Sequence, residues 1–103
     1  MAANPKPIRA NKLGGFLYMS FYCYILECVD GTYYTGWTTD PQRRLRQHNA
    51  GRGARYTSTR RPVRLAYVEP QPDRSSAQKR EIKIKKLTRA QKQALIQNTQ
   101  IGD

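Results

Sequence analysis

The chain has 103 residues, enough for one domain with a single hydrophobic core. Nineteen Lys and Arg outnumber seven Asp and Glu, and the formal net charge of +12 favours an anionic partner such as nucleic acid. The apolar runs are too short for a membrane span, and two Cys with one His cannot form a four-ligand structural zinc site. We therefore expect a cytoplasmic protein without a membrane partner.

The first part of the chain predicts a tail followed by a β-hairpin. Residues 1–19 are basic, contain scattered Pro and Gly, and lack a sustained period, which indicates a flexible tail. Aromatic and β-branched residues predict a strand over Phe21–Cys28. Asp30-Gly31 favours a turn, and Thr32–Trp37 predicts the returning strand.

The rest of the chain predicts three helices and a third strand. Asp40 is a predicted N-cap, with Pro41 at the first helical position. Asp73 or Ser75 is expected to cap the second helix, and a capping box is expected to open the third. In chain order we expect a helix over 41–50, a basic loop over 52–62, a strand over 63–68, a helix ending at Leu87 and a last helix over about 88–97.

The first predicted helix carries polar residues where an apolar face is expected. The spacing i, i+3, i+4 and i+7 from Pro41 selects Arg44, Leu45 and His48. A guanidinium and an imidazole therefore face the sheet, one turn apart. The structural alternative is that both side chains run along the edge of the sheet and end in water.

The second predicted helix shows the same anomaly with the opposite charge. Its best apolar stripe is Ala77, Glu81, Ile84 and Thr88, which places a carboxylate among apolar residues. Such a carboxylate needs a cation, either an ion pair with Arg44 or a neighbouring Lys, or a metal ion. One carboxylate can hold a largely hydrated Mg²⁺, and Arg matches the oxygens of a phosphate.

The predicted strands supply hydroxyl groups and one unusual glycine. Tyr22 and Tyr24 share one face of the first strand, and Tyr33 and Tyr34 take alternate faces of the second. Each tyrosine can equally well serve packing alone. Gly36 lies inside a strand-like run, where a missing side chain lets another group approach closely.

Together these residues resemble the GIY-YIG nuclease superfamily, and specifically its small single-domain UPF0213 subfamily. The resemblance spans roughly residues 21 to 97 and rests on an ordered set of motifs. The first signature is degenerate. The matching residues, in order, are Tyr22-Cys23-Tyr24, Tyr34-Thr35-Gly36, Arg44, His48, the basic stretch that contains Gly53-Ala54-Arg55-Tyr56-Thr57, and Glu81.

The resemblance implies an α+β fold, a three-stranded, mostly antiparallel sheet flanked by helices in the order β-β-α-β-α-α. It implies hydrolysis of DNA by an activated water with one Mg²⁺ or Mn²⁺ ion and no small-molecule cofactor. Glu81 would hold the metal, and Arg44 would bind the scissile phosphate. Tyr24, Tyr34 and His48 would position or deprotonate the water. The resemblance does not assign the role of general base to one of these three residues. A tyrosine base needs a depressed pKa, which Arg44 and the metal would favour.

Two departures from the family pattern bear on activity. Tyr22-Cys23 replaces a glycine and a branched residue, and Trp37 stands where some repair nucleases have a lysine. We expect a nuclease domain over residues 20–98 and a short tail over 99–103. We expect weak or broadly specific cleavage of branched, nicked or single-stranded DNA. Cleavage of RNA stays an open alternative, and the expected pathway is DNA repair or recombination.

Three alternatives compete with this interpretation. A non-catalytic nucleic-acid binder would use the basic residues that we expect to contact nucleic acid, together with Lys83 and Lys86. It would not need Glu81 on an apolar stripe. A PD-(D/E)xK nuclease would need a strand around Glu81. A ribosomal or membrane-surface role explains only the charge. The residues we expect to contact nucleic acid are Arg43, Arg46, Arg52, Arg55, Arg60, Arg61 and Lys85.

Overall fold

The computed structural model describes the backbone of residues 6–10 and 16–101 and the side chains of residues 20–98. Its central sheet has the strand order β4-β3-β5, with both strand pairs antiparallel. A separate pair of strands, β1 and β2, precedes it. The elements are β1 (Lys6–Ala10), β2 (Phe16–Met19), β3 (Phe21–Glu27), β4 (Tyr33–Thr38), α1 (Pro41–Asn49), α2 (Arg55–Ser58), β5 (Arg64–Gln71), α3 (Arg74–Lys85) and α4 (Arg89–Ile101).

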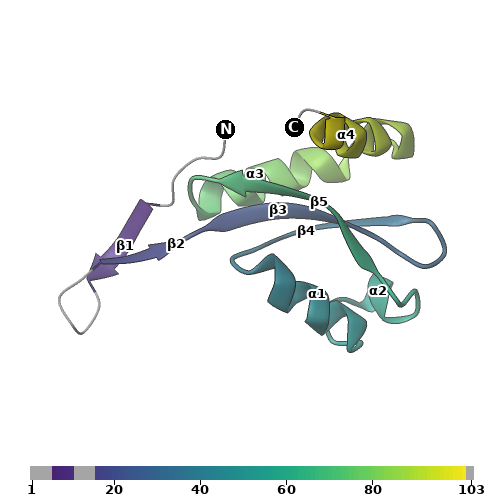
Figure 1. The fold of residues 1–103 in the computed structure, drawn as a ribbon, viewed down its shortest axis with the longest axis horizontal. Coiled ribbons are helices and arrows are strands. Elements are labelled where there is room, and N and C mark those ends of the chain that lie inside the picture. The colour runs from purple at the N-terminus through teal and green to yellow at the C-terminus, as the bar shows by residue number, and fades with distance from the viewer. Residues whose placement is uncertain (1–5, 11–15, 102–103) are drawn as a thin grey trace.

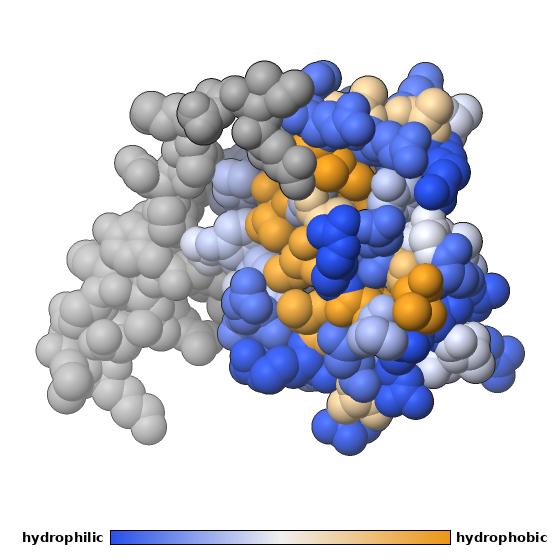
Figure 2. Space-filling model, turned by 45° about the vertical axis from the view of Figure 1, so that its right-hand side comes forward, coloured by the Kyte–Doolittle hydropathy of each residue, from blue (hydrophilic) through white to orange (hydrophobic). Residues whose placement is uncertain are grey.

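The sheet lies between two layers of helix, as Figure 1 shows, with α3 and α4 on one face and α1 and α2 on the other. Alternate residues of β3 enter two cores. Cys23 and Ile25 pack with Ala77 of α3, whereas Tyr24 and Leu26 belong to the core on the opposite face. Figure 2 shows apolar side chains gathered across the middle of one face, with hydrophilic side chains above and below. This is the predicted α+β fold.

Local sequence signals fix the N-termini of α1, α3 and α4 as expected. The Asp40 side chain accepts a hydrogen bond from the backbone N–H of Arg43 at 3.1 Å and caps α1. Asp73 caps α3 in the same way, accepting from Ser76 N–H at 2.8 Å. Before α4, Thr88 and Gln91 exchange reciprocal side-chain and backbone hydrogen bonds, which confirms the predicted capping box.

Several boundaries differ from the sequence-based prediction. Residues 6–10 and 16–19, expected to lie in a flexible tail, form β1 and β2. The short helix α2 lies inside the segment predicted as a basic loop, and β5 continues beyond Val68 to Gln71. Because α3 includes Glu81, the strand that a PD-(D/E)xK site requires there is not present.

No helix in the described part of the chain is both long and apolar enough to span a membrane.

Candidate active site

Three buried side chains form a chain of hydrogen bonds on the α1 side of the sheet. Tyr24 comes from β3, His48 from α1 and Thr57 from α2, and each is at most 1% exposed. The Tyr24 hydroxyl lies 2.9 Å from Nε2 of His48. Nδ1 of the same ring lies 2.8 Å from Oγ1 of Thr57. The imidazole is thus held at both nitrogens between a strand and a short helix.

The direction of these hydrogen bonds follows from the Thr57 hydroxyl. Its proton is donated to the backbone carbonyl of Ala54, at 3.1 Å, which can only accept. We therefore infer that Thr57 Oγ1 accepts from Nδ1–H of His48. In a neutral imidazole, Nε2 then carries no proton and accepts the hydrogen bond that the Tyr24 hydroxyl donates.

The surroundings keep both partners neutral at pH 7. Burial, and then the positive charge of Arg44, lower the pKa of His48 to about 4. Burial raises the pKa of Tyr24 to about 12, although Arg44 lowers that pKa through a hydrogen bond and its charge. Arg44 therefore favours the phenolate as expected, but the Tyr24 pKa is raised and not depressed, because desolvation outweighs the nearby guanidinium.

Two glycines make room for these rings. Gly36 pairs with Tyr24 across β3 and β4, and a Cβ atom on Gly36 would lie 2.5 Å from the Tyr24 hydroxyl. A Cβ atom on Gly53 would lie 2.3 Å from Nδ1 of His48. The close approach inferred from the sequence at Gly36 is that of the Tyr24 phenol. Gly53 and Thr57 were not singled out, although both lie in the Gly53–Thr57 motif.

Arg44 connects the buried ring pair with an open cleft. The guanidinium is half-buried and donates to the carbonyl of Gly53 at 2.8 Å and to the Gln47 side chain at 2.9 Å. The cleft has a volume of about 420 Å³ and lies between the ends of β4, α1 and α3. Arg74, which the sequence patterns did not indicate, adds a third guanidinium. The cleft is lined by Trp37, Thr38, Thr39, Arg43, Arg44, Gln47 and Arg74.

Tyr34 completes the group on this face. Its ring centroid lies 5.2 Å from that of His48 in an edge-on arrangement, and 6.2 Å from the stacked ring of Tyr56. The structure therefore brings four of the five predicted catalytic side chains together on one side of the sheet: Tyr24, Tyr34, Arg44 and His48.

Glu81 belongs to the helix that packs on the opposite face of the sheet (Figure 1). It lies on α3, and its described ion pair is with Lys85 one turn later, at 3.7 Å. This is the neighbouring-lysine alternative, and not an ion pair with Arg44. Burial is the main cause of the raised Tyr24 pKa, and the negative charge of Glu81 is the smallest contribution to it, so the carboxylate still lies within electrostatic reach of the phenol.

The Glu81 carboxylate is the candidate metal ligand of this site. Among residues 20–98, whose side chains the structure describes, no three side chains of His, Cys, Asp or Glu gather in one place. The Glu81 side chain keeps 19% of its surface exposed. A single, partly exposed carboxylate fits one hydrated Mg²⁺ or Mn²⁺ ion and does not fit a site built wholly from protein ligands.

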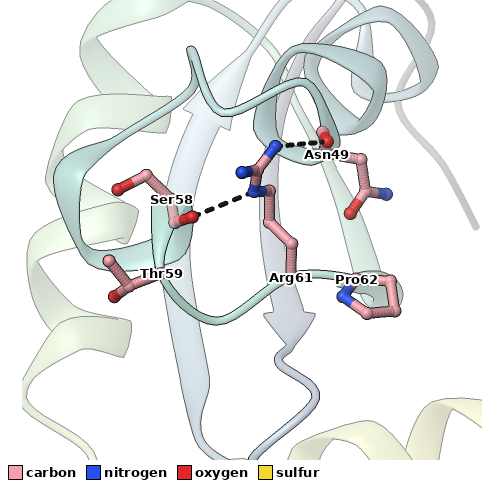
Figure 3. A pocket seen from close by; sticks show the side chains of 5 residues that line it. All are labelled: Asn49, Ser58, Thr59, Arg61 and Pro62. Atoms are coloured by element: carbon pink, nitrogen blue, oxygen red, sulfur yellow. Dashed lines mark hydrogen bonds between the residues drawn. The ribbon is translucent and has the colours of Figure 1, made fainter.

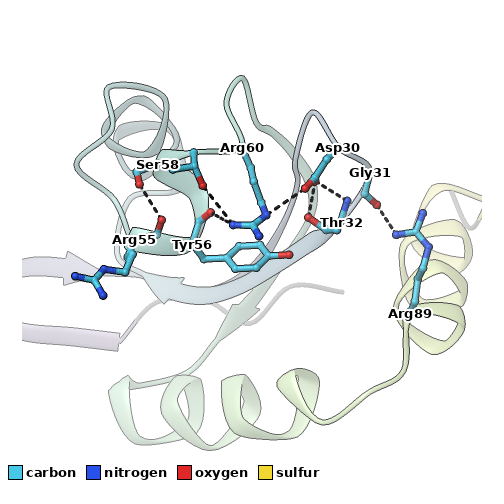
Figure 4. A network of polar contacts seen from close by, with 9 residues as sticks. Asp30, Gly31, Thr32, Arg55, Tyr56, Ser58, Arg60 and Arg89 are labelled. Carbon is cyan, nitrogen blue, oxygen red and sulfur yellow. Dashed lines mark hydrogen bonds and ion pairs between the residues drawn. The ribbon is translucent and has the colours of Figure 1, made fainter.

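The predicted phosphate-binding residues fall into two groups. Arg60 and Arg61 already hold the loop around α2 in place. Arg61 donates to the carbonyls of Ser58, at 2.9 Å, and Asn49, at 3.1 Å, beside a shallow pocket (Figure 3). Arg60 lies over the Tyr56 ring at 3.8 Å and pairs with Asp30 (Figure 4). The remaining predicted residues are exposed: Arg43, Arg46, Arg52, Arg55 and Lys85.

Comparison with known proteins places the fold and these motifs in one family. The family model described as the GIY-YIG catalytic domain matches residues 20–94. The chain belongs to the GIY-YIG family. Relatives of this GIY-YIG chain include a UPF0213 protein of Halobacterium salinarum, 57% identical over 74 residues that cover 72% of this chain and 96% of the relative. Another, from Syntrophus aciditrophicus, is 53% identical over 76 residues, covering 73% of this chain and 87% of the relative.

Two solution NMR structures support the same relationship. A UPF0213 protein of Bacillus halodurans is 44% identical, with a TM-score of 0.50, over 77% of this chain and 84% of the other. A protein of E. faecalis is 39% identical, with a TM-score of 0.56, over 93% of this chain and 95% of the other. The predicted GIY-YIG and UPF0213 relationship is confirmed, and the domain has a nuclease-type fold.

Proposed function

We propose that this GIY-YIG protein is a metal-dependent endonuclease that hydrolyses phosphodiester bonds of DNA in the cytoplasm, in repair or recombination. One observation carries the proposal: the Tyr24–His48–Thr57 hydrogen-bond chain lies beside Arg44. Burial and the charge of Arg44 keep the imidazole neutral, so its Nε2 is free of a proton and can accept one from Tyr24 during the reaction.

The proposed reaction passes a proton along this chain. A water molecule attacks the phosphorus and gives a proton to the Tyr24 oxygen, while Tyr24 gives its own proton to Nε2 of His48. The bond from phosphorus to the leaving oxygen breaks, and that oxygen takes a proton from solvent. His48 then returns its proton to solvent. Both groups are neutral before the reaction, as this transfer requires.

Arg44 and Glu81 have separate parts in this proposal. Arg44 lines the cleft and would stabilise the charge that develops on the phosphate oxygens. Glu81 would hold one Mg²⁺ or Mn²⁺ ion, which when bound supplies a Lewis acid beside the phosphate. The exposed arginines around the cleft would bind the flanking backbone of a branched, nicked or single-stranded DNA.

A substrate screen with one matched pair of variants tests the proposal. Labelled linear, nicked, flapped and four-way DNA are incubated with Mg²⁺, with Mn²⁺ or with EDTA. Arg44→Ala should lower the single-turnover rate about 10²-fold or more. Arg46→Ala removes an exposed charge from the same helix, so it should weaken DNA binding but change the single-turnover rate little when the protein is saturating. Equal rates for Arg44→Ala and wild type would refute the proposed role of Arg44.

A non-catalytic nucleic-acid binder is the second candidate, and the Glu81–Lys85 ion pair favours it because that pair gives the acid a structural partner. Glu81→Gln separates the two. A nuclease should lose turnover and keep its DNA affinity, since the metal ligand is gone and the basic surface is intact. A binder has no metal-dependent turnover to lose, in the wild type or in the variant.

A further inference from the structure

Another cavity lies beside the edge strand β4, next to the candidate active site. Its volume is about 370 Å³. We call it the tyrosine–lysine pocket, and its lining comes from β4, α2, α3 and α4. The lining residues are Tyr33, Tyr34, Thr35, Tyr56, Lys85 and Lys92.

Two positive charges converge on this pocket. Lys85 comes from α3 and Lys92 from α4. Burial, and then the charge of Lys85, lower the pKa of Lys92. The described ion-pair partner of Lys85 is Glu81, at 3.7 Å, which is too long for a strong hydrogen bond. An anion between the two ammonium groups would relieve their repulsion and accept their hydrogens.

One of the lining residues, Thr35, has an unused hydroxyl. Thr35 is 2% exposed, and its Oγ1 is a buried oxygen without a hydrogen-bond partner in the described part of the chain. Leaving a buried hydroxyl unpaired is costly, and native proteins usually satisfy such groups. A ligand oxygen that enters the pocket deeply enough to reach Thr35 Oγ1 would supply the missing acceptor.

The aromatic rings of the pocket already have partners on their faces. The Tyr56 ring has the Arg60 guanidinium 3.8 Å above it (Figure 4) and the stacked Tyr34 ring 6.2 Å away. The Tyr33 ring lies under the Arg89 guanidinium, at 5.0 Å. What the pocket offers is hydrogen-bond donors and positive charge, which suit a phosphate and not a nucleobase.

We propose that the tyrosine–lysine pocket binds a backbone phosphate of the nucleic-acid strand, next to the phosphate that is cleaved. This inference rests on the proposed nuclease function. Tyr34 lines the pocket and also contacts His48, so the two sites share a wall. Lys92, Lys85 and Thr35 are then positioning residues, which fix the register of the strand relative to Arg44.

Binding measured in EDTA tests the pocket without requiring turnover. A short thymidine oligonucleotide and inorganic phosphate are titrated separately into the full-length protein, followed by amide NMR shifts and by affinity at several salt concentrations. We expect the Thr35 and Lys92 amides to shift with both probes. Lys92→Gln should weaken oligonucleotide binding about fivefold at 0.1 M salt and reduce the salt slope by about 0.7.

Two further variants serve as matched comparisons. Lys83→Gln removes the same charge from an exposed position on α3 that does not line the pocket, and it should leave the Thr35 shift intact. Thr35→Val keeps the shape but removes the unpaired hydroxyl. It should preserve the melting temperature while weakening binding of both probes.

The outcomes separate this inference from the nuclease proposal. If Lys92→Gln and Thr35→Val bind both probes as Lys83→Gln does, the pocket is not a phosphate site, whatever the activity of the wild type. If both variants weaken binding and the Thr35 shift disappears, the pocket stands even if no DNA substrate is cut. Inorganic phosphate binding without an oligonucleotide-induced shift would also overturn it, because the backbone would then not reach the pocket.

Discussion

The Tyr24 hydroxyl and Nε2 of His48 lie 2.9 Å apart, between the central strand β3 and helix α1. His48 is the chain's single histidine. Its other nitrogen is held by Thr57, at 2.8 Å. The ring is therefore fixed with Nε2 toward the phenol. The arrangement can be tested by substitutions of Tyr24 or of His48.

Removing the Tyr24 hydroxyl should abolish the proposed proton transfer while leaving the ring in the core. We expect Tyr24→Phe to lower the single-turnover cleavage rate about 10²-fold. Binding of DNA in EDTA should change little, because Arg44 and the exposed cations remain. Tyr22→Phe removes a hydroxyl from the same strand and is the matched control. Equal losses in both variants would contradict a specific role for Tyr24.

Adding one methyl group at Gly36 should displace the Tyr24 phenol. The new Cβ atom would lie 2.5 Å from the hydroxyl and 2.7 Å from Cζ, so the ring must move. We expect Gly36→Ala to lower the free energy of unfolding by about 1–3 kcal/mol, as measured by denaturant titration. In a Tyr24→Leu background the same substitution should cost less. An equal cost in both backgrounds would show that the clash with Tyr24 is not the cause.

Local signals in the sequence were sufficient for much of the fold. Asp40 and the Thr88–Gln91 box each make the hydrogen bonds that their positions predict, because capping depends on residues within one turn. The polar face of α1 was also predictable, since Arg44 and His48 follow from helical spacing alone. Periodicity of this kind depends on the helix and not on its neighbours.

Tertiary relationships could not be obtained in the same way. Helix α2 has only four residues, and its N-cap, Ala54, makes no side-chain hydrogen bond. The helix is held instead by burial of Thr57 against His48, a contact that no local pattern encodes. The stripe on α3 indicated that Glu81 faces the sheet, but not that α3 and α1 lie on opposite faces. Family resemblance supplied the grouping that periodicity could not.

The stability of the protein should depend on pH through His48. Its folded-state pKa is depressed from the ordinary 6.5 to about 4, so the unfolded chain binds a proton more readily between these values. The stability present above the unfolded pKa is therefore lost as the pH falls. Between about pH 7.5 and about pH 5, we expect the free energy of unfolding to decrease by about 2 kcal/mol.

A histidine-free variant isolates this effect. Most carboxyl groups titrate near pH 4, below the chosen range, and the chain has one histidine. His48→Gln should therefore show a much flatter dependence of unfolding free energy on pH than wild type, even if it is less stable throughout. The same slope in both proteins would mean that His48 is not buried in its neutral form.

Alanine variants of Arg61 and Arg55 should distinguish an arginine that stabilises the fold from one that binds nucleic acid. Arg61 donates to the carbonyls of Ser58 and Asn49 and joins α1 to the loop after α2 (Figure 3), so Arg61→Ala should lower the free energy of unfolding by about 1 kcal/mol or more. The Arg55 side chain is exposed, and Arg55→Ala should leave stability unchanged. It should instead weaken DNA binding and reduce the salt slope by about 0.9 for duplex DNA.

Thermal unfolding and salt-dependent affinity measured on both variants check the assignment. A destabilised Arg55→Ala, or an Arg61→Ala that loses only DNA affinity, would reverse it.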